Sequence, residues 1–116
     1  MLMVERTGEQ LAARIVKAET FSQRLIGLMG KLSMSSREAL IIDPCNQVHT
    51  FFVFFPIDLL FIDENNVVIK QVKSIPPFRI SPKVKSAQRV VELKGGTLKK
   101  LDIVEGDRLL IRPGSR

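Results

Sequence analysis

Apolar residues along this chain occur mostly in short runs that are separated by charged, glycine-containing or proline-containing segments. Runs of five to eight residues that are rich in Val, Ile, Leu and Phe are typical of β-strands. An early strand is expected within residues 11–18, where β-branched and small apolar residues lie among charges. We predict further strands over residues 39–43, 48–55, 57–63, 67–73, 89–93 and 108–112.

One segment has the spacing of a helix instead. Thr20 and Gln23 stand three residues apart, as the two partners of a capping box do. Behind them an apolar stripe recurs at helical spacing, and Gly30 is placed to end the helix in a left-handed conformation. The stripe consists of Phe21, Leu25, Leu28 and Met29. The sequence therefore predicts one short amphipathic helix, followed by a serine-rich loop over residues 31–37.

Turn residues divide the rest of the chain. Residues 64–66 form a hairpin signal, because Asn tolerates the positive φ of tight turns. Three prolines make residues 74–85 an irregular crossing segment, and the glycines at 95–96 precede a second short helix over residues 98–101. The fold predicted for residues 1–116 is a single mainly-β domain, either a β-sandwich or a partly open barrel with one or two short helices.

Composition sets the class of protein. The 116 residues, 45% hydrophobic and 26% charged, suit one globular domain rather than a disordered chain. No apolar run approaches the roughly 18 residues that a membrane-spanning helix needs. The N-terminus carries an acid and a base where a secretion signal would be apolar, and one cysteine forms no internal disulfide. A cytoplasmic protein with no membrane partner is expected.

Positive charge is concentrated in one part of the chain. The formal net charge is +6, yet residues 70–100 alone hold nine Lys or Arg and one Glu, a balance of +8. Such a stretch indicates a possible polyanion partner, although the only aromatic residue within it is Phe78. We expect at most weak nucleic-acid binding, and the candidate residues are Lys73, Arg79, Lys83, Lys85 and Arg89.

Five of the seven phenylalanines fall between residues 45 and 63, where a histidine, a threonine and an aspartate also stand among apolar residues. If residues 48–55 are a strand, both of its faces are apolar, so we predict that it is buried on two sides. Asp58 shares a strand face with two apolar residues, and a carboxylate there needs partners. We predict that it is at least half buried and bonded to Arg24, His49, Thr50 or a backbone amide. The predicted core includes Phe52, Phe54, Leu60 and Ile62.

Several of these residues also carry a family resemblance. The central motif is His49-Thr50-Phe51-Phe52, then Pro56-Ile57-Asp58, Phe61 and Asp63. Around it stand Arg24 with Gly27-Leu28-Met29, Val91-Glu92-Leu93 with Gly95-Gly96, and Gly106-Asp107. Together they resemble a widespread family of small bacterial and archaeal proteins known only as a domain of unknown function. The resemblance implies a compact mainly-β fold and supplies no activity, substrate or cofactor; many relatives are exported or membrane-anchored.

Cys45 and His49 are the candidates for metal or nucleophile chemistry. On a strand, positions four apart lie about 13 Å from each other, beyond the reach of one metal ion or one hydrogen bond. A turn at Pro44 brings them closer, but two ligands are still too few for a zinc site. We therefore expect no metal and no cofactor.

The polar residues that remain suggest a pocket. Arg24 is the natural ion-pair partner of a half-buried Asp58 or Glu92, in a pair that would fix the helix to the sheet. The first hypothesis for the function is a non-enzymatic binding or accessory domain with a polar pocket near His49, Thr50 and Asp58. The second is a hydrolase that uses Asp58 with His49 or Glu92, and the third is the polyanion binder. The ligand-binding candidates are Arg24, His49, Thr50, Asp58 and Glu92; the sequence does not name a ligand, a protein partner or an oligomeric state.

Overall fold

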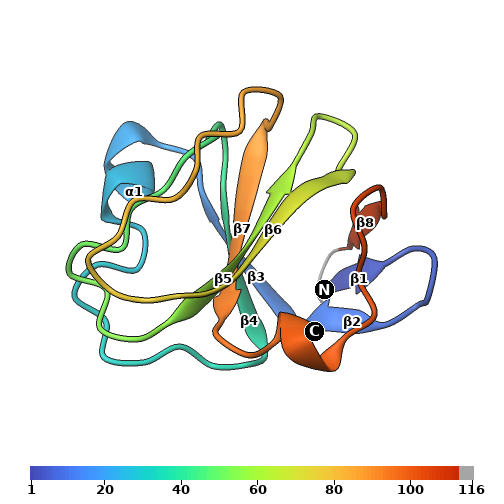
Figure 1. Ribbon diagram of the computed structural model, residues 1–116, viewed down its shortest axis with the longest axis horizontal. Coiled ribbons are helices and arrows are strands. Elements are labelled where there is room, and N and C mark those ends of the chain that lie inside the picture. Colours follow the sequence, from blue (N-terminus) through green and yellow to red (C-terminus); the bar gives the residue numbers. More distant parts are fainter. Residues whose placement is uncertain (113–116) are drawn as a thin grey trace.

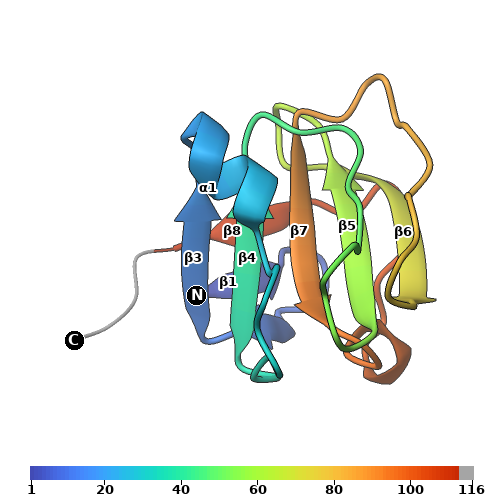
Figure 2. The same ribbon diagram turned by 90° about the vertical axis from the view of Figure 1, so that its left-hand side faces the viewer.

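A five-stranded sheet lies at the centre of the molecule in the computed structural model, which describes residues 1–112 (Figure 1). Its strands follow the order β3-β4-β7-β5-β6, which Figure 2 shows from left to right. They are β3 (Arg14–Ala18), β4 (Glu38–Ile42), β5 (Ile57–Ile62), β6 (Val68–Ile75) and β7 (Arg89–Lys94). All but β3 correspond closely to predicted strands. The molecule is a mainly-β, sandwich-like structure, as the sequence predicts.

The strand connections follow the turn signals. β3 and β4 pair in parallel and are linked through the helix, whereas the other neighbours in the sheet are antiparallel. β5 and β6 form the predicted hairpin. Asp63 Oδ1 accepts hydrogen bonds from the backbone amides of Asn65 and Val67 at 2.8 and 2.9 Å, and Asn66 has a φ of 64°. The turn therefore depends on the local bonding of Asp63 and on the tolerance of Asn for positive φ.

A smaller sheet covers one face of the large one. It has the order β2-β1-β8, with β1 (Leu2–Val4), β2 (Gln10–Ala12) and β8 (Leu109–Ile111). The strand predicted over residues 11–18 is divided at Ala13 between β2 and β3, so its two halves belong to different sheets. Apolar side chains from both sheets form the core between them, including Leu2, Ile41 and Leu60.

The helix α1 (Phe21–Ile26) begins as predicted and ends early. Gln23 N donates to Thr20 Oγ1, and Thr20 N donates to Gln23 Oε1, both at 3.2 Å, which completes the capping box. The helix ends at Gly27 instead of Gly30, so half of the predicted apolar stripe lies on the surface: Phe21 is 75% exposed. The second short helix, η1 (Leu98–Lys100), forms where expected. No helix in residues 1–112 is long and apolar enough to cross a bilayer.

Residues 48–55 do not form the strand that the apolar pattern predicts. This segment is a loop on the opposite face of the large sheet from β1, and a single β-bridge joins His49 to Ile80. The chain turns at residues 51–52, which leaves Phe52 and Phe54 55% and 50% exposed. Their assignment to the core is therefore wrong, whereas that of Leu60 and Ile62 is confirmed, since both are fully buried.

Candidate functional site

Glu92 is a buried carboxyl group in the middle of the large sheet. On β7 it pairs with Leu40 of β4 and Leu59 of β5, and cross-strand partners point to the same face. All three side chains therefore face the layer formed by α1 and the loops. Glu92 is only 3% exposed, and burial raises its pKa to about 8. Its Oε1 atom has no hydrogen-bond partner among the described residues.

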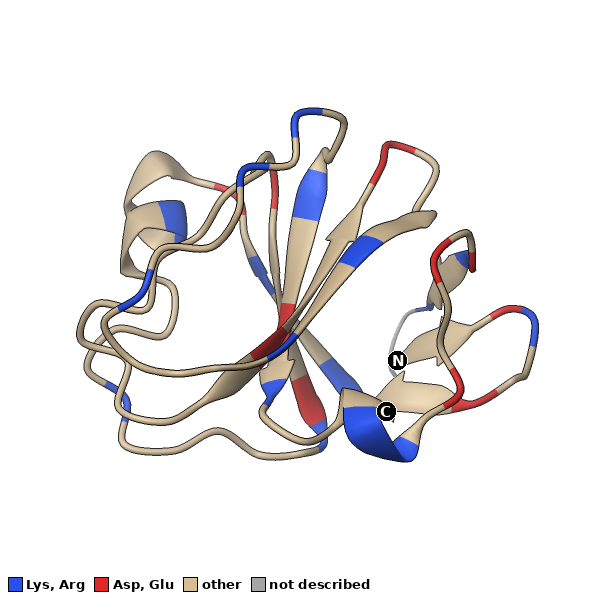
Figure 3. Cartoon of the chain, viewed as in Figure 1, with Lys and Arg blue, Asp and Glu red and all other residues tan. Residues whose placement is uncertain are grey.

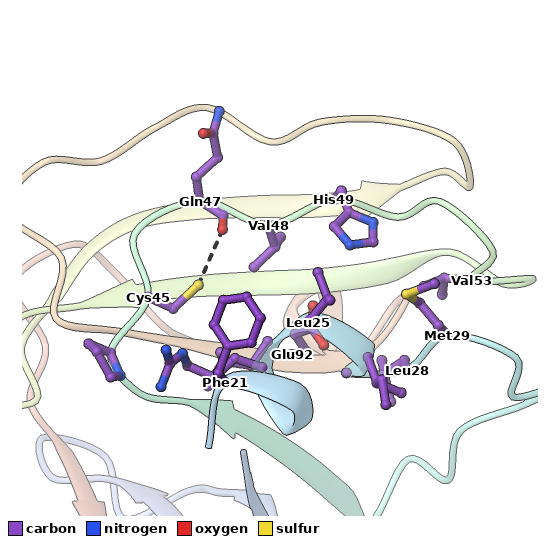
Figure 4. Close-up of a pocket in the computed structure, with 15 residues that line it drawn as sticks. Phe21, Leu25, Leu28, Met29, Cys45, Gln47, Val48, His49, Val53 and Glu92 are labelled. Atoms are coloured by element: carbon purple, nitrogen blue, oxygen red, sulfur yellow. Dashed lines mark hydrogen bonds between the residues drawn. The ribbon is translucent and has the colours of Figure 1, made fainter. Parts of the chain in front are cut away.

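The unpartnered carboxyl group lies at a pocket of about 250 Å³ between the sheet, α1 and the loop that follows β4 (Figure 4). Most of the pocket wall is apolar, including Leu28, Val48 and Val53. Gly27 packs directly over the carboxyl group: a Cβ there would make ordinary van der Waals contact with Glu92 Oε1 at 3.8 Å, and a φ of +49° disfavours any other residue. Besides Glu92, the ionisable groups that line the pocket are Arg24, Cys45 and His49.

Arg24 lies at the pocket but does not form the predicted ion pair. Its Nη1 donates to the backbone oxygen of Glu19 at 2.7 Å, and no salt bridge joins it to Asp58 or Glu92 in the described structure. The capping box holds only the start of the helix, and Leu28, two residues after its end, anchors this part of the chain in the core. The Arg24 side chain is therefore only partly buried, and its charge stands beside the pocket.

Cys45 and His49 line the same pocket with separate bonding partners. Cys45 Sγ donates to the backbone oxygen of Gln47 at 3.2 Å, and burial raises the pKa of the thiol, which opposes thiolate formation. His49 Nδ1 accepts a hydrogen bond from Phe51 N at 3.2 Å, and its ring stacks on that of Phe51. No three His, Cys, Asp or Glu residues within residues 1–112 cluster closely enough to hold a metal ion.

Asp58 is fully buried and bonded, as predicted, and its partners are backbone amides. Oδ1 accepts from Ser74 N at 2.7 Å and Oδ2 accepts from Leu98 N at 2.8 Å. The carboxylate thereby ties the end of β6 and the start of η1 to β5. Both of its oxygen atoms have protein partners, and its side chain lies outside the pocket.

Thr50 is also fully buried and joins two loops. Its Oγ1 donates to the backbone oxygen of Pro76 at 2.7 Å and accepts from Arg79 N at 2.8 Å. Its own backbone N donates to Arg79 O, and its backbone O accepts from Phe78 N. Thr50 therefore connects the 44–56 loop to the 74–88 loop, and the structure does not bring it into the pocket.

The predicted polyanion-binding residues divide into two kinds. Lys73, Arg79, Lys83 and Lys85 are exposed. Arg89 is instead half buried and forms a 2.8 Å ion pair with Asp43. Although burial opposes it, the hydrogen bonds from Arg89 and Gln88 hold the pKa of Asp43 below its usual value. Four of the five candidate residues are thus exposed to solvent, whereas the guanidinium group of Arg89 is already paired with Asp43.

Comparison with known proteins identifies the family. The model of DUF192, described as an uncharacterised conserved family, matches residues 2–111. The chain belongs to the DUF192 family. Relatives named UPF0127 protein occur in Thermococcus kodakarensis and Thermococcus gammatolerans, each 28% identical to this chain. The alignments cover 97% and 92% of this chain, and 74% and 72% of the relatives.

Two solved structures are similar to this member of DUF192. A protein of unknown function from Novosphingobium aromaticivorans superposes with a TM-score of 0.84 at 21% identity, over 95% of this chain and 83% of that one. A protein from Sinorhizobium meliloti, described as a candidate transcription regulator, gives a TM-score of 0.76 at 26% identity. That match covers 83% of this chain and 79% of the other. The first comparison supports the fold alone.

The motifs that carry the DUF192 resemblance separate into two groups in this structure. One group is structural: Thr50, Asp58 and Asp63 bond to backbone groups, and a Cβ at Gly95 would lie 2.8 Å from Pro56 O. The other group meets at the pocket and consists of Arg24, Gly27-Leu28-Met29, His49 and Glu92. Gly27 was not predicted to be a pocket residue, although a glycine before the predicted end of the helix was a usable signal.

Proposed function

We propose that this protein is a non-enzymatic binding protein for a small molecule that has an apolar body and one hydrogen-bonding group. The observation that carries the proposal is Glu92 Oε1, an unpartnered atom of a side chain that is 97% buried (3% exposed) beside a pocket of about 250 Å³. Buried polar groups are nearly always paired, so an orphaned one beside open space points to a ligand. A ligand group bonded to Oε1 relieves a desolvation cost of about 1–3 kcal/mol.

The state of the carboxyl group narrows the ligand class. Because burial raises its pKa to about 8, Glu92 is mostly protonated at neutral pH and both donates and accepts hydrogen bonds. A neutral hydroxyl or amide on the ligand matches this group without the burial of a new charge. The apolar walls, with Leu28, Val48 and Val53, suit the rest of such a molecule.

The geometry gives less support to a hydrolase. A general acid/base pair needs two groups within reach of one substrate atom. Asp58 pairs with Leu93 across β5 and β7 and faces the small sheet, whereas Glu92 faces the pocket. Both oxygen atoms of Asp58 are also occupied by backbone amides. A reaction that combines Asp58 with Glu92 or His49 therefore has no shared site in this arrangement.

Weak nucleic-acid binding is the second candidate function. Lys73, Arg79, Lys83 and Lys85 are exposed. The fold also places the rings of Phe51 and Phe52 beside Phe78, so the aromatic surface is larger than the single Phe78 within residues 70–100 indicates. The description of the Sinorhizobium meliloti protein as a candidate transcription regulator also favours this reading. If it holds, affinity for duplex DNA decreases linearly with log salt, by about 0.9 log units for each phosphate neutralised.

A matched pair of probes tests the small-molecule proposal. Benzyl alcohol and toluene share an apolar ring, and only benzyl alcohol carries a hydroxyl group for Glu92. In two-dimensional ¹H–¹⁵N NMR titrations we expect both to shift the amides of Leu28, Cys45 and Val53. Benzyl alcohol should bind about five to ten times more tightly, as one hydrogen bond implies.

Two substitutions of Glu92 complete this test. Glu92→Gln keeps a hydrogen-bonding group and should preserve the preference for benzyl alcohol, whereas Glu92→Leu should reverse it. Absence of shifts at the pocket amides with either probe would contradict the proposal. An unchanged preference in Glu92→Leu would also contradict it, because the hydroxyl group would then bind elsewhere.

A cytoplasmic location also remains a proposal for this chain. The single cysteine, which forms no internal disulfide and so needs no oxidising compartment, supports it. Fractionation of cells that produce the protein at its natural level would test it, and recovery from the exported fraction would contradict it.

A further inference from the structure

Exposed apolar side chains gather on one side of the molecule, the left-hand side of Figure 1, where α1 and three loop segments lie (Figure 1). We call this the loop surface and define it as residues 20–37, 44–56 and 74–88. It holds nine of the eleven large apolar side chains that are exposed within residues 1–112, among them Leu32 (84%) and Ile80. Exposed apolar groups gathered in this way are uncommon on a soluble domain and mark an interaction site.

The aromatic part of the loop surface is held firmly in place. The ring of Phe78 packs against Phe51 and Phe52, with centroids 6.3 and 5.9 Å apart. Phe52 and Phe78 both have positive φ, near 60°, which is unfavourable for a bulky residue. Hydrogen bonds hold both turns, since Thr50 O accepts from Phe78 N and Gly30 N donates to Phe52 O. The fold therefore maintains strained backbone that presents these rings to solvent.

The charges of the loop surface all have one sign. Residues 20–37, 44–56 and 74–88 contain six Lys or Arg and no Asp or Glu. Figure 3 shows blue positions along this side, with red positions at its margin. The acids that adjoin these segments in the chain are Glu19, which precedes the helix, Glu38, which is paired with Arg14, and Asp43, which is paired with Arg89. The six basic residues are Arg24, Lys31, Arg37, Arg79, Lys83 and Lys85.

We propose that the loop surface docks the protein onto an anionic lipid bilayer. The combination of exposed Phe, Leu and Ile with basic residues matches both parts of a membrane surface, its acyl boundary and its negative headgroups. No spanning segment is involved. No membrane partner was predicted from the sequence, because these residues become neighbours only when the three segments fold together.

Other occupants fit the loop surface less well. A second copy of the chain would place six like charges against six others in a symmetric dimer, which opposes association. Nucleic acid would match the charge and the rings, but its binding through phosphates and stacked bases does not account for exposed aliphatic side chains such as Leu25, Leu32 and Ile80. Arg24 and Leu25 also line the pocket at Glu92, but the proposal does not require that pocket to be occupied, because Leu32, Phe52, Phe78 and Ile80 lie outside it.

Vesicle flotation with the full chain tests the proposal. The probes are vesicles of phosphatidylcholine alone and vesicles that also contain about 30 mol% phosphatidylserine, at about 0.1 M salt. We expect the protein to float with the anionic vesicles and to remain mostly unbound with the neutral ones. Raising the salt to about 0.5 M should weaken binding without abolishing the apolar part.

Variants of the loop surface separate the two contributions. Phe52→Asn/Phe78→Asn removes both rings and keeps residues that tolerate positive φ, so the fold is retained. It should lower partitioning roughly tenfold or more. Lys31→Gln/Arg79→Gln should lower partitioning roughly 25-fold, at about fivefold for each cation. The matched controls Val104→Ser and Lys99→Gln/Lys100→Gln change exposed residues outside the loop surface and should bind as the parent does.

Three outcomes would overturn the proposal. The first is equal recovery with neutral and anionic vesicles. The second is an equal loss of binding in the control variants and in the loop-surface variants. The third is a preference for another occupant. One such result is binding to a single-stranded oligonucleotide at the same salt concentration that is lost in Phe52→Asn/Phe78→Asn, while the vesicle binding of that variant is unchanged. Another is a stable dimer in sedimentation equilibrium that the same variant dissociates.

Discussion

Asp58 and Glu92 are buried on adjacent strands of one sheet, and their side chains point to opposite faces of it. Asp58 pairs across the strands with Leu93, and Glu92 pairs with Leu59, which fixes the two carboxyl groups in different layers. The two carboxyl groups also differ in their hydrogen bonds. Asp58 accepts two backbone hydrogen bonds, whereas Glu92 has an oxygen atom without a partner. The Asp58 carboxyl group therefore stabilises the fold, and the Glu92 carboxyl group is the one that we propose bonds to a ligand.

Replacement of Asp58 should weaken the fold. In Asp58→Ala the amides of Ser74 and Leu98 lose their acceptor, and we expect a loss of roughly 2–4 kcal/mol in the free energy of unfolding. Asp58→Asn keeps one acceptor oxygen and should lose less. Urea unfolding followed by circular dichroism measures both values. A loss in Asp58→Ala no greater than in Asp58→Asn would mean that these two bonds contribute little.

The raised pKa of Glu92 should make stability depend on pH. Between pH 4.5 and about 8 the folded protein keeps a proton on Glu92 that the unfolded chain has released. The free energy of unfolding therefore falls as pH rises through this window, by about 1.4 kcal/mol per pH unit, and the dependence ends above pH 8.

Glu92→Gln is the reference for this measurement, because glutamine has a similar shape and does not titrate. The difference in unfolding free energy between the parent protein and Glu92→Gln should change with pH in the direction stated above. Urea unfolding at a series of pH values gives this difference. If the two proteins show parallel curves from pH 5 to about 8, Glu92 is ionised in the folded state at neutral pH.

The hydroxyl group of Thr50 should hold the 74–88 loop. Thr50→Val has nearly the same shape and loses the bonds with Pro76 O and Arg79 N, so we expect a loss of about 1–3 kcal/mol. Amide hydrogen exchange at Phe78 and Arg79 should accelerate at the same time. Thr50→Ser keeps the hydroxyl group and serves as the control; exchange in Thr50→Val that is no faster than in Thr50→Ser would show that the hydroxyl group does not hold the loop.

The phenylalanines at positions 54 and 61 should differ in their effect on stability. Phe61→Ala removes a fully buried ring and should cost about 3–5 kcal/mol, whereas Phe54→Ala removes a half-exposed ring and should cost about 1 kcal/mol or less. Denaturant midpoints of the two variants give the comparison. Similar losses would show that Phe54 is covered in solution.

Residues 48–55 show how far hydrophobic pattern alone predicts this fold. The strands over residues 57–63 and 89–93 were predictable because every apolar position there is needed by one of the two cores. The same density of apolar residues at 48–55 does not indicate burial, because Phe51, Phe52 and Phe54 remain on the surface. A prediction from the apolar pattern assumes that apolar residues are buried, so it is wrong where they remain exposed in the fold.

The candidate pocket was only partly predictable for a related reason. Arg24, His49 and Glu92 were identified as unusual residues, but their convergence depends on the helix that joins β3 to β4 and on the register of β7. The predicted ion pair of Arg24 with a carboxylate followed from charge alone. In the structure a backbone oxygen provides the partner of Arg24 instead.

The ends of the five-stranded sheet also affect how the protein behaves at high concentration. β3 and β6 are its outermost strands, and such strands can recruit another chain through their free backbone groups. Arg14 and Lys17 project from the first, Lys70 and Lys73 from the second, and the β5–β6 pairing is irregular at two points. Arg14 is paired with Glu38, so repulsion among Lys17, Lys70 and Lys73 is what disfavours edge-to-edge pairing of two such sheets, and the architecture resists growth into fibres.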